Sequence, residues 1–267
     1  MDNICFRIFL TVTTSFLLAS THAESDSLFL QTIFIRLYRR DGSVTDMYME
    51  NGRQLWPQVD NNKQVVLYIH GYFGNVEVED AQLVANAYLM NTDSVVLVAD
   101  YREAATLLYP IAVELSENVG KTIANILNNM VKSGMDPRKL HIIGHSLGSQ
   151  VAGFVGRNTN FRVPRITGLD PAGPLFYIFK SHLRVSDAEF VDIIHTDMGF
   201  YGLALTIGHV DFFPNFGYRP QPGCALYGVL LSFLDICNHI KSYAFYVESI
   251  RNPNAFVGVR CAHDVQY

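Results

Sequence analysis

The chain has 267 residues, of which 49% are hydrophobic, 12% aromatic and 17% charged. This composition is that of a globular protein and excludes a disordered or low-complexity chain. The formal net charge is −5 and no basic run is present, which argues against a nucleic-acid partner held by phosphate contacts. The length fits one large α/β domain, and no linker or internal repeat divides the sequence.

The N-terminus has the pattern of a secretory signal peptide. Arg7 precedes an uncharged run from Ile8 to Ala19, and a cleavage site follows at Ala23. The run of about 12 residues is too short to span a bilayer as a helix. We therefore expect residues 1–23 to be removed and residues 24–267 to be secreted; an uncleaved membrane anchor is the alternative.

Secretion gives the cysteines a structural meaning, because disulfides form in oxidising compartments. Cys5 leaves with the signal peptide, and Cys224, Cys237 and Cys261 remain. We expect the two that are near in sequence, Cys224 and Cys237, to pair, with Cys261 free or intermolecular. Closing this short loop would contribute roughly 3 kcal/mol through chain entropy.

Strand and helix patterns alternate along the chain. Continuous β-branched runs predict strands that are covered on both faces, and apolar residues at helical spacing predict helices. The expected strands are residues 28–39, 43–49, 65–69, 94–99, 140–143, 165–169 and 190–194, and the expected helices are residues 81–90, 111–131, 149–157 and 241–250. This order predicts an α/β fold, a single domain with a mostly parallel central sheet and helices on both faces. Residues 199–237 are irregular, so we expect functional loops there.

The pentapeptide Gly144-His145-Ser146-Leu147-Gly148 has the pattern Gly-x-Ser-x-Gly. The pattern alone is weak, because chance supplies it in roughly a tenth of chains of this length. Here it follows an expected strand and precedes an expected helix, which is the setting of a nucleophile elbow. We therefore interpret Ser146 as a nucleophile; a tight turn that happens to contain serine is the alternative.

A nucleophilic serine needs a base to take its proton and an acid to orient that base. In hydrolases with such an elbow, the acid and then the histidine follow the serine along the chain. Asp170 satisfies this order and ends an expected strand. Asp100 precedes the serine, and Asp187 and Asp192 lie in or beside a strand. We expect Asp170 to be the acid.

Five histidines follow Asp170, and the residues alone do not single out one base. Two of them belong to His-x-Asp pairs, which could suggest metal ligands, but no third ligand lies at a useful spacing and loop-fixing hydrogen bonds are the simpler interpretation. His239 follows the expected disulfide and precedes an expected helix, where a pinned loop could hold a base in register. The five are His182, His195, His209, His239 and His263.

An oxyanion that develops on the attacked carbonyl needs backbone N–H donors. One candidate is the N–H group of Leu147, directly after the serine. The other is that of Tyr72, because Gly71 after an expected strand lets the backbone turn toward the serine. An ordinary strand-ending turn at this point is the alternative.

Several blocks of the sequence resemble the pancreatic-lipase-type family of secreted lipases, over about residues 55–261. The blocks are residues 68–72, 143–148, 168–174, 190–197, 208–215, 221–224 and 237–239. The resemblance implies an α/β-hydrolase fold and an oxyanion hole at Tyr72 and Leu147. It also implies a triad of Ser146, Asp170 and His239, and so selects His239 among the five histidines.

Departures from the family pattern carry further expectations. Members with a C-terminal β-sandwich domain, which docks colipase or a surface, need many more than the six residues after Cys261. We therefore expect no such domain and no colipase partner. Some members hold calcium before the strand at residue 190, but Asp187 is the one acidic residue that would fit, so we expect no metal. We also expect no cofactor, and a monomer.

The resemblance implies a secreted carboxylic ester hydrolase acting on lipids at a membrane or lipid-droplet surface. An inactive lipid carrier on the same fold is the alternative of another class, and the presence of serine, acid and histidine together argues against it. An acyltransferase or a cutinase-like esterase would share the triad.

The segment between Cys224 and Cys237 forms the lid over the site in this family. Here it has 12 residues, eight of them large and apolar, with Asp235 the one charge. It should contact the acyl groove or a lipid surface; a hairpin tucked into the core is the alternative. In this family a short lid and a short loop after Asp197 go with phospholipase A1 activity, and triacylglycerol hydrolysis is the alternative.

Overall fold

A central sheet organises the part of the chain that the computed structural model describes, residues 29–48, 56, 60–230 and 232–261. The sheet has eight strands in the order β2-β1-β4-β3-β5-β6-β7-β8. The strands are β1 (Phe34–Tyr38), β2 (Val44–Tyr48), β3 (Val65–Ile69), β4 (Val95–Asp100), β5 (Leu140–His145), β6 (Arg165–Leu169), β7 (Phe190–Ile194) and β8 (Val210–Phe212). Strands β3 to β8 run parallel, and β1 is antiparallel to both of its neighbours.

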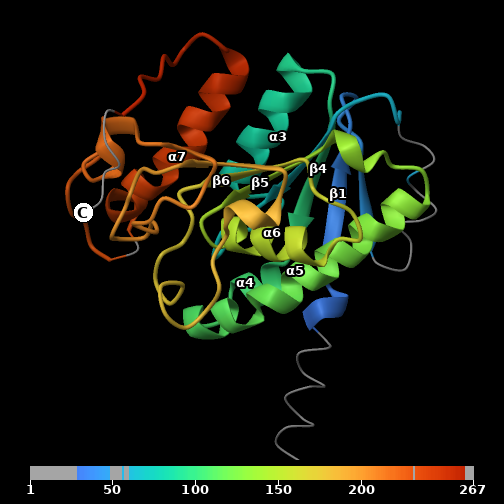
Figure 1. Cartoon of the computed structure of the whole chain (residues 1–267), viewed down its shortest axis with the longest axis horizontal. Helices are drawn as coiled ribbons and strands as arrows, with labels where there is room; N and C mark the ends of the chain where they lie inside the picture. The colour runs from blue at the N-terminus through green and yellow to red at the C-terminus, as the bar shows by residue number, and fades with distance from the viewer. Residues whose placement is uncertain (1–28, 49–55, 57–59, 231, 262–267) are drawn as a thin grey trace, which may run out of the picture.

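Helices cover both faces of the sheet. They are α3 (Glu79–Asn91), α4 (Arg102–Ala105), α5 (Tyr109–Lys132), α6 (Leu147–Asn158) and α7 (Phe233–Arg251). Helices α3 and α7 lie on one face and α4, α5 and α6 on the other (Figure 1). This is the α/β-hydrolase architecture that the resemblance implies, and the expected mostly parallel sheet is confirmed.

Each face of the sheet has its own apolar core. Every residue of β3 and β4 is buried, as their continuous β-branched runs predict. Along β3, Leu67 joins the core beneath α5 and α6, whereas Val66 and Tyr68 join the core beneath α3 and α7. The sheet is thereby fixed between two helical layers, and the carboxyl ends of its parallel strands meet at one edge.

Two expected starts differ from the structure by more than two residues, and two short elements were not expected. Helix α7 begins at Phe233 rather than at residue 241, so His239 lies inside a helix and not before one. Its start was hidden because an apolar run precedes it, although the side chain of Ser232 caps it by accepting a hydrogen bond from the N–H of Asp235. Strand β1 begins at Phe34 rather than at residue 28, and the short elements α4 and β8 carry too few residues for a period.

The expected disulfide is present between Cys224 and Cys237. Cys261 is exposed and bonds to no cysteine among the described residues. The predicted signal peptide, residues 1–23, lies outside the described residues. Within the described ranges, no helix combines the length and the apolar character that crossing a membrane requires.

A buried ion pair anchors α6 to the segment before β7. Asp187 is fully buried, and its two carboxylate oxygens accept hydrogen bonds from Nε and Nη2 of Arg157 at 2.8 and 2.7 Å. The backbone N–H of Arg184 donates to the same carboxylate at 3.1 Å. Because its oxygens are held by a guanidinium, Asp187 and the residues around it do not fit a calcium site.

We expect Arg157→Met to lower the free energy of unfolding by about 3 kcal/mol, because it removes the bidentate partner of a buried carboxylate and leaves only the longer ion pair with the exposed Arg184. Urea unfolding followed by circular dichroism measures this change. Arg138→Met is the control, since Arg138 pairs with Asp136 at the surface with 87% of its side chain exposed, and its effect should be much smaller. Equal effects of the two variants would contradict the structural role of the Arg157–Asp187 pair.

Candidate active site

Ser146 lies at the sharp turn between β5 and α6, with φ 55° and ψ −122°. A non-glycine residue at positive φ is strained, so the surrounding contacts must hold it in place. The two motif glycines allow those contacts. A Cβ on Gly144 would lie 2.3 Å from the carbonyl oxygen of Gly148, and a Cβ on Gly148 would lie 2.2 Å from that of Ile69. The elbow is therefore pressed against the ends of its own strand and of β3.

Asp170 follows β6 directly and lies beside the elbow. The N–H of Ser146 donates to the carbonyl of Leu169 at 3.0 Å, and the N–H of Ala172 donates to the carbonyl of Ser146 at 3.1 Å. The Asp170 carboxylate is fully buried. Its Oδ1 accepts hydrogen bonds from the backbone N–H groups of Thr196 and Asp197 at 2.8 and 3.1 Å. These donors satisfy an oxygen of a carboxylate that solvent does not reach.

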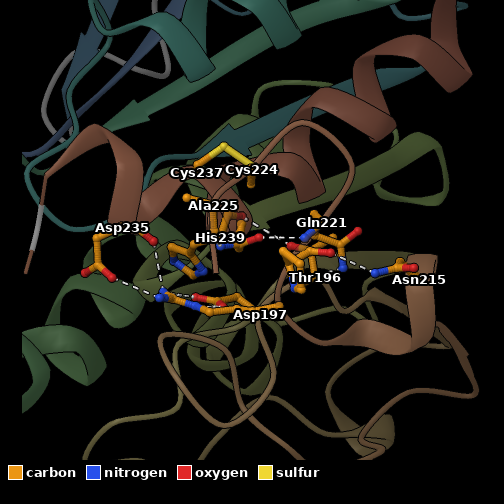
Figure 2. Close-up of a disulfide and its surroundings, with 12 residues drawn as sticks. Thr196, Asp197, Asn215, Gln221, Cys224, Ala225, Asp235, Cys237 and His239 are labelled. Atoms are coloured by element: carbon orange, nitrogen blue, oxygen red, sulfur yellow. Dashed lines mark hydrogen bonds and ion pairs between the residues drawn. A yellow bond between two sulfur atoms is a disulfide. The ribbon is translucent and has the colours of Figure 1, made fainter. Parts of the chain in front are cut away.

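His239 reaches this carboxylate from the first half of α7. Its Nδ1 lies 2.6 Å from Oδ2 of Asp170, and Figure 2 shows it below the disulfide, beside Thr196 and Asp197. Ser146 Oγ and the His239 ring form no hydrogen bond with each other in this structure, and such contacts are often loose without substrate. The ring of the neighbouring His145 lies 4.9 Å from that of His239. The structure thus brings the three expected residues to one edge of the sheet.

The remaining histidines fix loops. His195 is buried with Nε2 2.8 Å from Oδ1 of Asp211, and Nδ1 of His209 accepts the backbone N–H of Val191 at 2.9 Å. The ring of His182 contacts the carbonyl of Leu183 at 2.7 Å. His263 lies outside the described residues. The loop-fixing interpretation of the His-x-Asp pairs therefore agrees with the structure.

The two expected oxyanion donors flank the elbow. Leu147 is the first residue of α6, and a Cβ on Gly71 would lie 3.0 Å from Cβ of Ser146, which places the following Tyr72 close by. The Tyr72 hydroxyl donates to the carbonyl of Leu107 at 2.8 Å and anchors this loop. Among the described residues, the N–H groups of Tyr72 and Leu147 donate to no acceptor. Both remain available for a developing oxyanion.

His145, the second residue of the pentapeptide, has a role that sequence reasoning missed. Its Nδ1 lies 3.7 Å from Oδ2 of Asp80, which accepts a hydrogen bond from the Tyr68 hydroxyl at 2.7 Å. Burial lowers the pKa of the His145 ring below its ordinary value, although Asp80 opposes this shift. A neutral His145 ring places no positive charge beside His239. The variable position of the motif gave no signal of this contact.

Asp197 also has contacts that sequence reasoning missed, and it belongs to one of the His-x-Asp pairs. One ligand atom each of Asp170, Asp197 and His239 lie within 4.8 Å of one another, and this is the one potential metal-ligating group of three among the described residues. Those atoms already have partners, because Asp170 bonds to His239 and Asp197 is paired with the guanidinium of Arg219. Burial raises the pKa of Asp197, and the hydrogen bond from Arg219 opposes that shift.

Comparison with known proteins gives a consistent result. A family model described as Lipase matches residues 39–267. Pancreatic triacylglycerol lipase of Oryctolagus cuniculus is 40% identical over 217 residues, covering 73% of this chain and 46% of that protein. The protein of the same name from Homo sapiens is 36% identical over 224 residues, covering 75% and 47%. Pancreatic lipase-related protein 2 of Mus musculus is 40% identical over 185 residues, covering 61% and 38%. The chain spans about half the length of the curated relatives it matches.

We expect Gly148→Ala to lower kcat/KM for a soluble ester by about 100-fold. The added methyl group would push α6 away from β3 and change the position of Ser146 relative to the expected oxyanion donor at Tyr72. Hydrolysis of p-nitrophenyl butyrate measures the loss. Gly258→Ala is the matched control, since nothing lies within 4 Å of a Cβ there. Full activity of Gly148→Ala would show that the elbow does not need this close contact.

Proposed function

The chain belongs to the lipase family, and from this premise we propose that it hydrolyses carboxylic esters of lipids. Ser146 is the proposed nucleophile, His239 the base and Asp170 the acid that orients the base. The observation that carries the proposal is the 2.6 Å hydrogen bond between His239 and the buried Asp170 carboxylate, next to a strained serine elbow. This is the arrangement that acyl transfer by a serine requires.

Proton transfer follows from the orientation of the imidazole. Nδ1 of His239 donates to Asp170, so the other ring nitrogen, Nε2, is the one that can take the Ser146 proton as the oxygen attacks the ester carbon. The carboxylate stabilises the imidazolium that results. The imidazolium then gives the proton to the leaving alcohol, and water hydrolyses the acyl-enzyme by the same steps.

Charge on the attacked carbonyl oxygen is stabilised by the N–H groups of Tyr72 and Leu147. Leu147 is also at the N-terminus of α6, where the helix dipole favours negative charge. These donors are held by backbone contacts before substrate arrives, so they need no reorganisation during the reaction. The proposed reaction therefore uses side chains and backbone of this chain, without a cofactor.

The surface around the site favours a lipid substrate in a membrane or droplet. Within the lid segment, residues 225–236, several apolar side chains are exposed rather than tucked into the core. The Tyr227 ring lies 6.1 Å from that of Phe200, which extends the apolar surface to the loop after β7. The exposed apolar side chains of the lid are Leu226, Tyr227, Val229, Leu230 and Leu234. Such a surface suits contact with lipid.

The short lid supports phospholipids as substrates, because a bulky polar head group needs an open site. The loop between Asp197 and Gly208 is also short. We therefore propose phospholipase A1-like hydrolysis. The second candidate is triacylglycerol hydrolysis, which the names of the relatives favour. The signal-peptide pattern and the disulfide support secretion.

We expect Ser146→Ala to lower ester hydrolysis by roughly 10⁴-fold or more while leaving the fold intact, because only one hydroxyl at the elbow is lost. Hydrolysis of p-nitrophenyl butyrate and the circular dichroism spectrum test both parts. Ser133→Ala, at the end of α5, is the control and should keep full activity. An active Ser146→Ala enzyme would refute the nucleophile, and an inactive wild-type protein would support the lipid carrier.

We expect the purified protein to release fatty acid from phosphatidylcholine vesicles, at the sn-1 position, because the lid leaves room for the head group. Triolein emulsion is assayed in parallel, and a phosphatidylcholine labelled differently on its two acyl chains identifies the bond that is cleaved. Fatty acid released from triolein alone would end the phospholipase proposal in favour of the second candidate.

A further inference from the structure

A second buried carboxylate stands next to the proposed base. Asp197 is fully buried, and its N–H donates to the Asp170 carboxylate at 3.1 Å. Its carboxylate, that of Asp170 and a ring nitrogen of His239 lie within 4.8 Å of one another. The proposed mechanism uses Asp170 but gives Asp197 no task.

An uncompensated charge on Asp197 would harm the proposed reaction. A carboxylate within about 4–6 Å of an imidazole favours the protonated ring. Because an imidazole is ordinarily more basic than a carboxylate by roughly 2.6 pH units, the ring rather than Asp197 would take up the proton. A ring that is already protonated cannot accept the proton of Ser146. The site therefore needs a positive charge that acts on Asp197 and not on Asp170.

Arg219 supplies this charge. Its Nε and Nη2 donate to the two carboxylate oxygens of Asp197 at 2.5 and 2.9 Å, a bidentate pair. Its Nη1 donates to Oδ1 of Asp235 at 2.9 Å, and Nη2 also donates to the backbone carbonyl of Asp235. Only 2% of the side chain is exposed. The guanidinium lies 4.3 Å from the ring centre of Phe200, a cation–π contact.

We propose that Arg219 is a positioning residue for His239: by neutralising Asp197, it leaves Asp170 as the carboxylate that acts on the ring and keeps the ring uncharged before reaction. This inference rests on the proposed function. Lysine could supply the charge but not the fork that holds Asp197 and Asp235 together. Since Asp235 belongs to the lid segment, the same guanidinium ties the base of the lid to the site (Figure 2 shows Asp197, Asp235 and His239 together).

Several other ionisable groups lie around His239, on the elements that pack against it. Asp170 follows β6, and Asp197 and Tyr201 follow β7, with the Tyr201 ring 5.7 Å from the imidazole. His145 ends β5, and Asp80 of α3 lies behind it. None of these groups contributes a fixed positive charge beside Asp197. Arg219 is the guanidinium that contacts Asp197 among the described residues.

The test compares the pH dependence of kcat/KM for p-nitrophenyl butyrate in four variants. Arg219→Met leaves Asp197 uncompensated, so the acidic limb of the profile should move up by roughly one pH unit, with activity recovering at higher pH. Asp197→Asn removes the anion and should move the limb to lower pH. The double variant should return close to wild type, and Arg219→Lys should retain most of the wild-type profile.

These outcomes separate a positioning role from a structural one. Opposite shifts of the two single variants, cancelling in the double variant, support the proposal. In Arg219→Met, a uniform loss of kcat without a shift of the acidic limb would overturn the proposal. If Arg219→Met does not fold, an unshifted acidic limb in Asp197→Asn would overturn it. Arg138→Met, which removes a surface arginine, is the control and should leave the profile unchanged.

The wild-type assay keeps this inference distinct from the proposed function. If wild-type protein and Ser146→Ala hydrolyse the ester equally slowly, the proposed function fails and the inference falls with it. If the wild-type protein is active and the limbs do not shift, the inference alone fails.

Discussion

The hydrogen bond between Asp170 and His239 is the interaction on which the rest of the site depends. It joins the end of β6 to α7, across 69 residues of sequence, and both side chains are buried. A buried carboxylate is costly unless several donors satisfy it. The N–H groups of Thr196 and Asp197 do so from the chain after β7, so three segments meet at one side chain.

Parallel strands explain why these segments meet. Ser146 follows β5, Asp170 follows β6 and Thr196 follows β7, and these strands are neighbours in the sheet. Their carboxyl ends share an edge, where chains leave the sheet and backbone donors point outward. The strain at Ser146 is sustained by the same packing, because the motif glycines let α6 sit directly against β3. The Cys224–Cys237 disulfide and the Arg219–Asp235 ion pair then hold α7, and with it His239, over this edge.

Sequence patterns predicted the strands and the site residues that depend on short stretches of the chain. Residues 65–69 could be predicted as a strand because an unbroken apolar run is typical of burial on both faces. Ser146 could be predicted from its motif between a strand and a helix, and Asp170 from its place at the end of a strand after the serine. His239 could not be singled out by its neighbours, since what distinguishes it is contact with Asp170, which only the fold creates. The family resemblance supplied that choice. The helix that contains His239 was expected to begin after this residue, because the apolar residues before it show no helical period.

Arg219 and His145 show more clearly which contacts of the site could not be predicted from the sequence. Arg219 lies 22 positions after Asp197, beyond the short strand β8, and nothing in its sequence neighbourhood marks it as buried. His145 occupies a position that the motif leaves open. Each contacts a carboxylate that is distant in sequence, Asp197 for Arg219 and Asp80 for His145, so these contacts follow from packing and burial rather than from pattern.

We propose above all that Ser146 is a nucleophile activated by the Asp170–His239 pair. Labelling with a fluorophosphonate and peptide mass spectrometry tests this assignment most directly, because the probe reacts much faster with an activated serine than with an ordinary one. The expected result is one adduct on the peptide that contains Ser146, formed much more slowly in Asp170→Asn. An adduct on another residue, no adduct, or an undiminished rate in Asp170→Asn would contradict the claim.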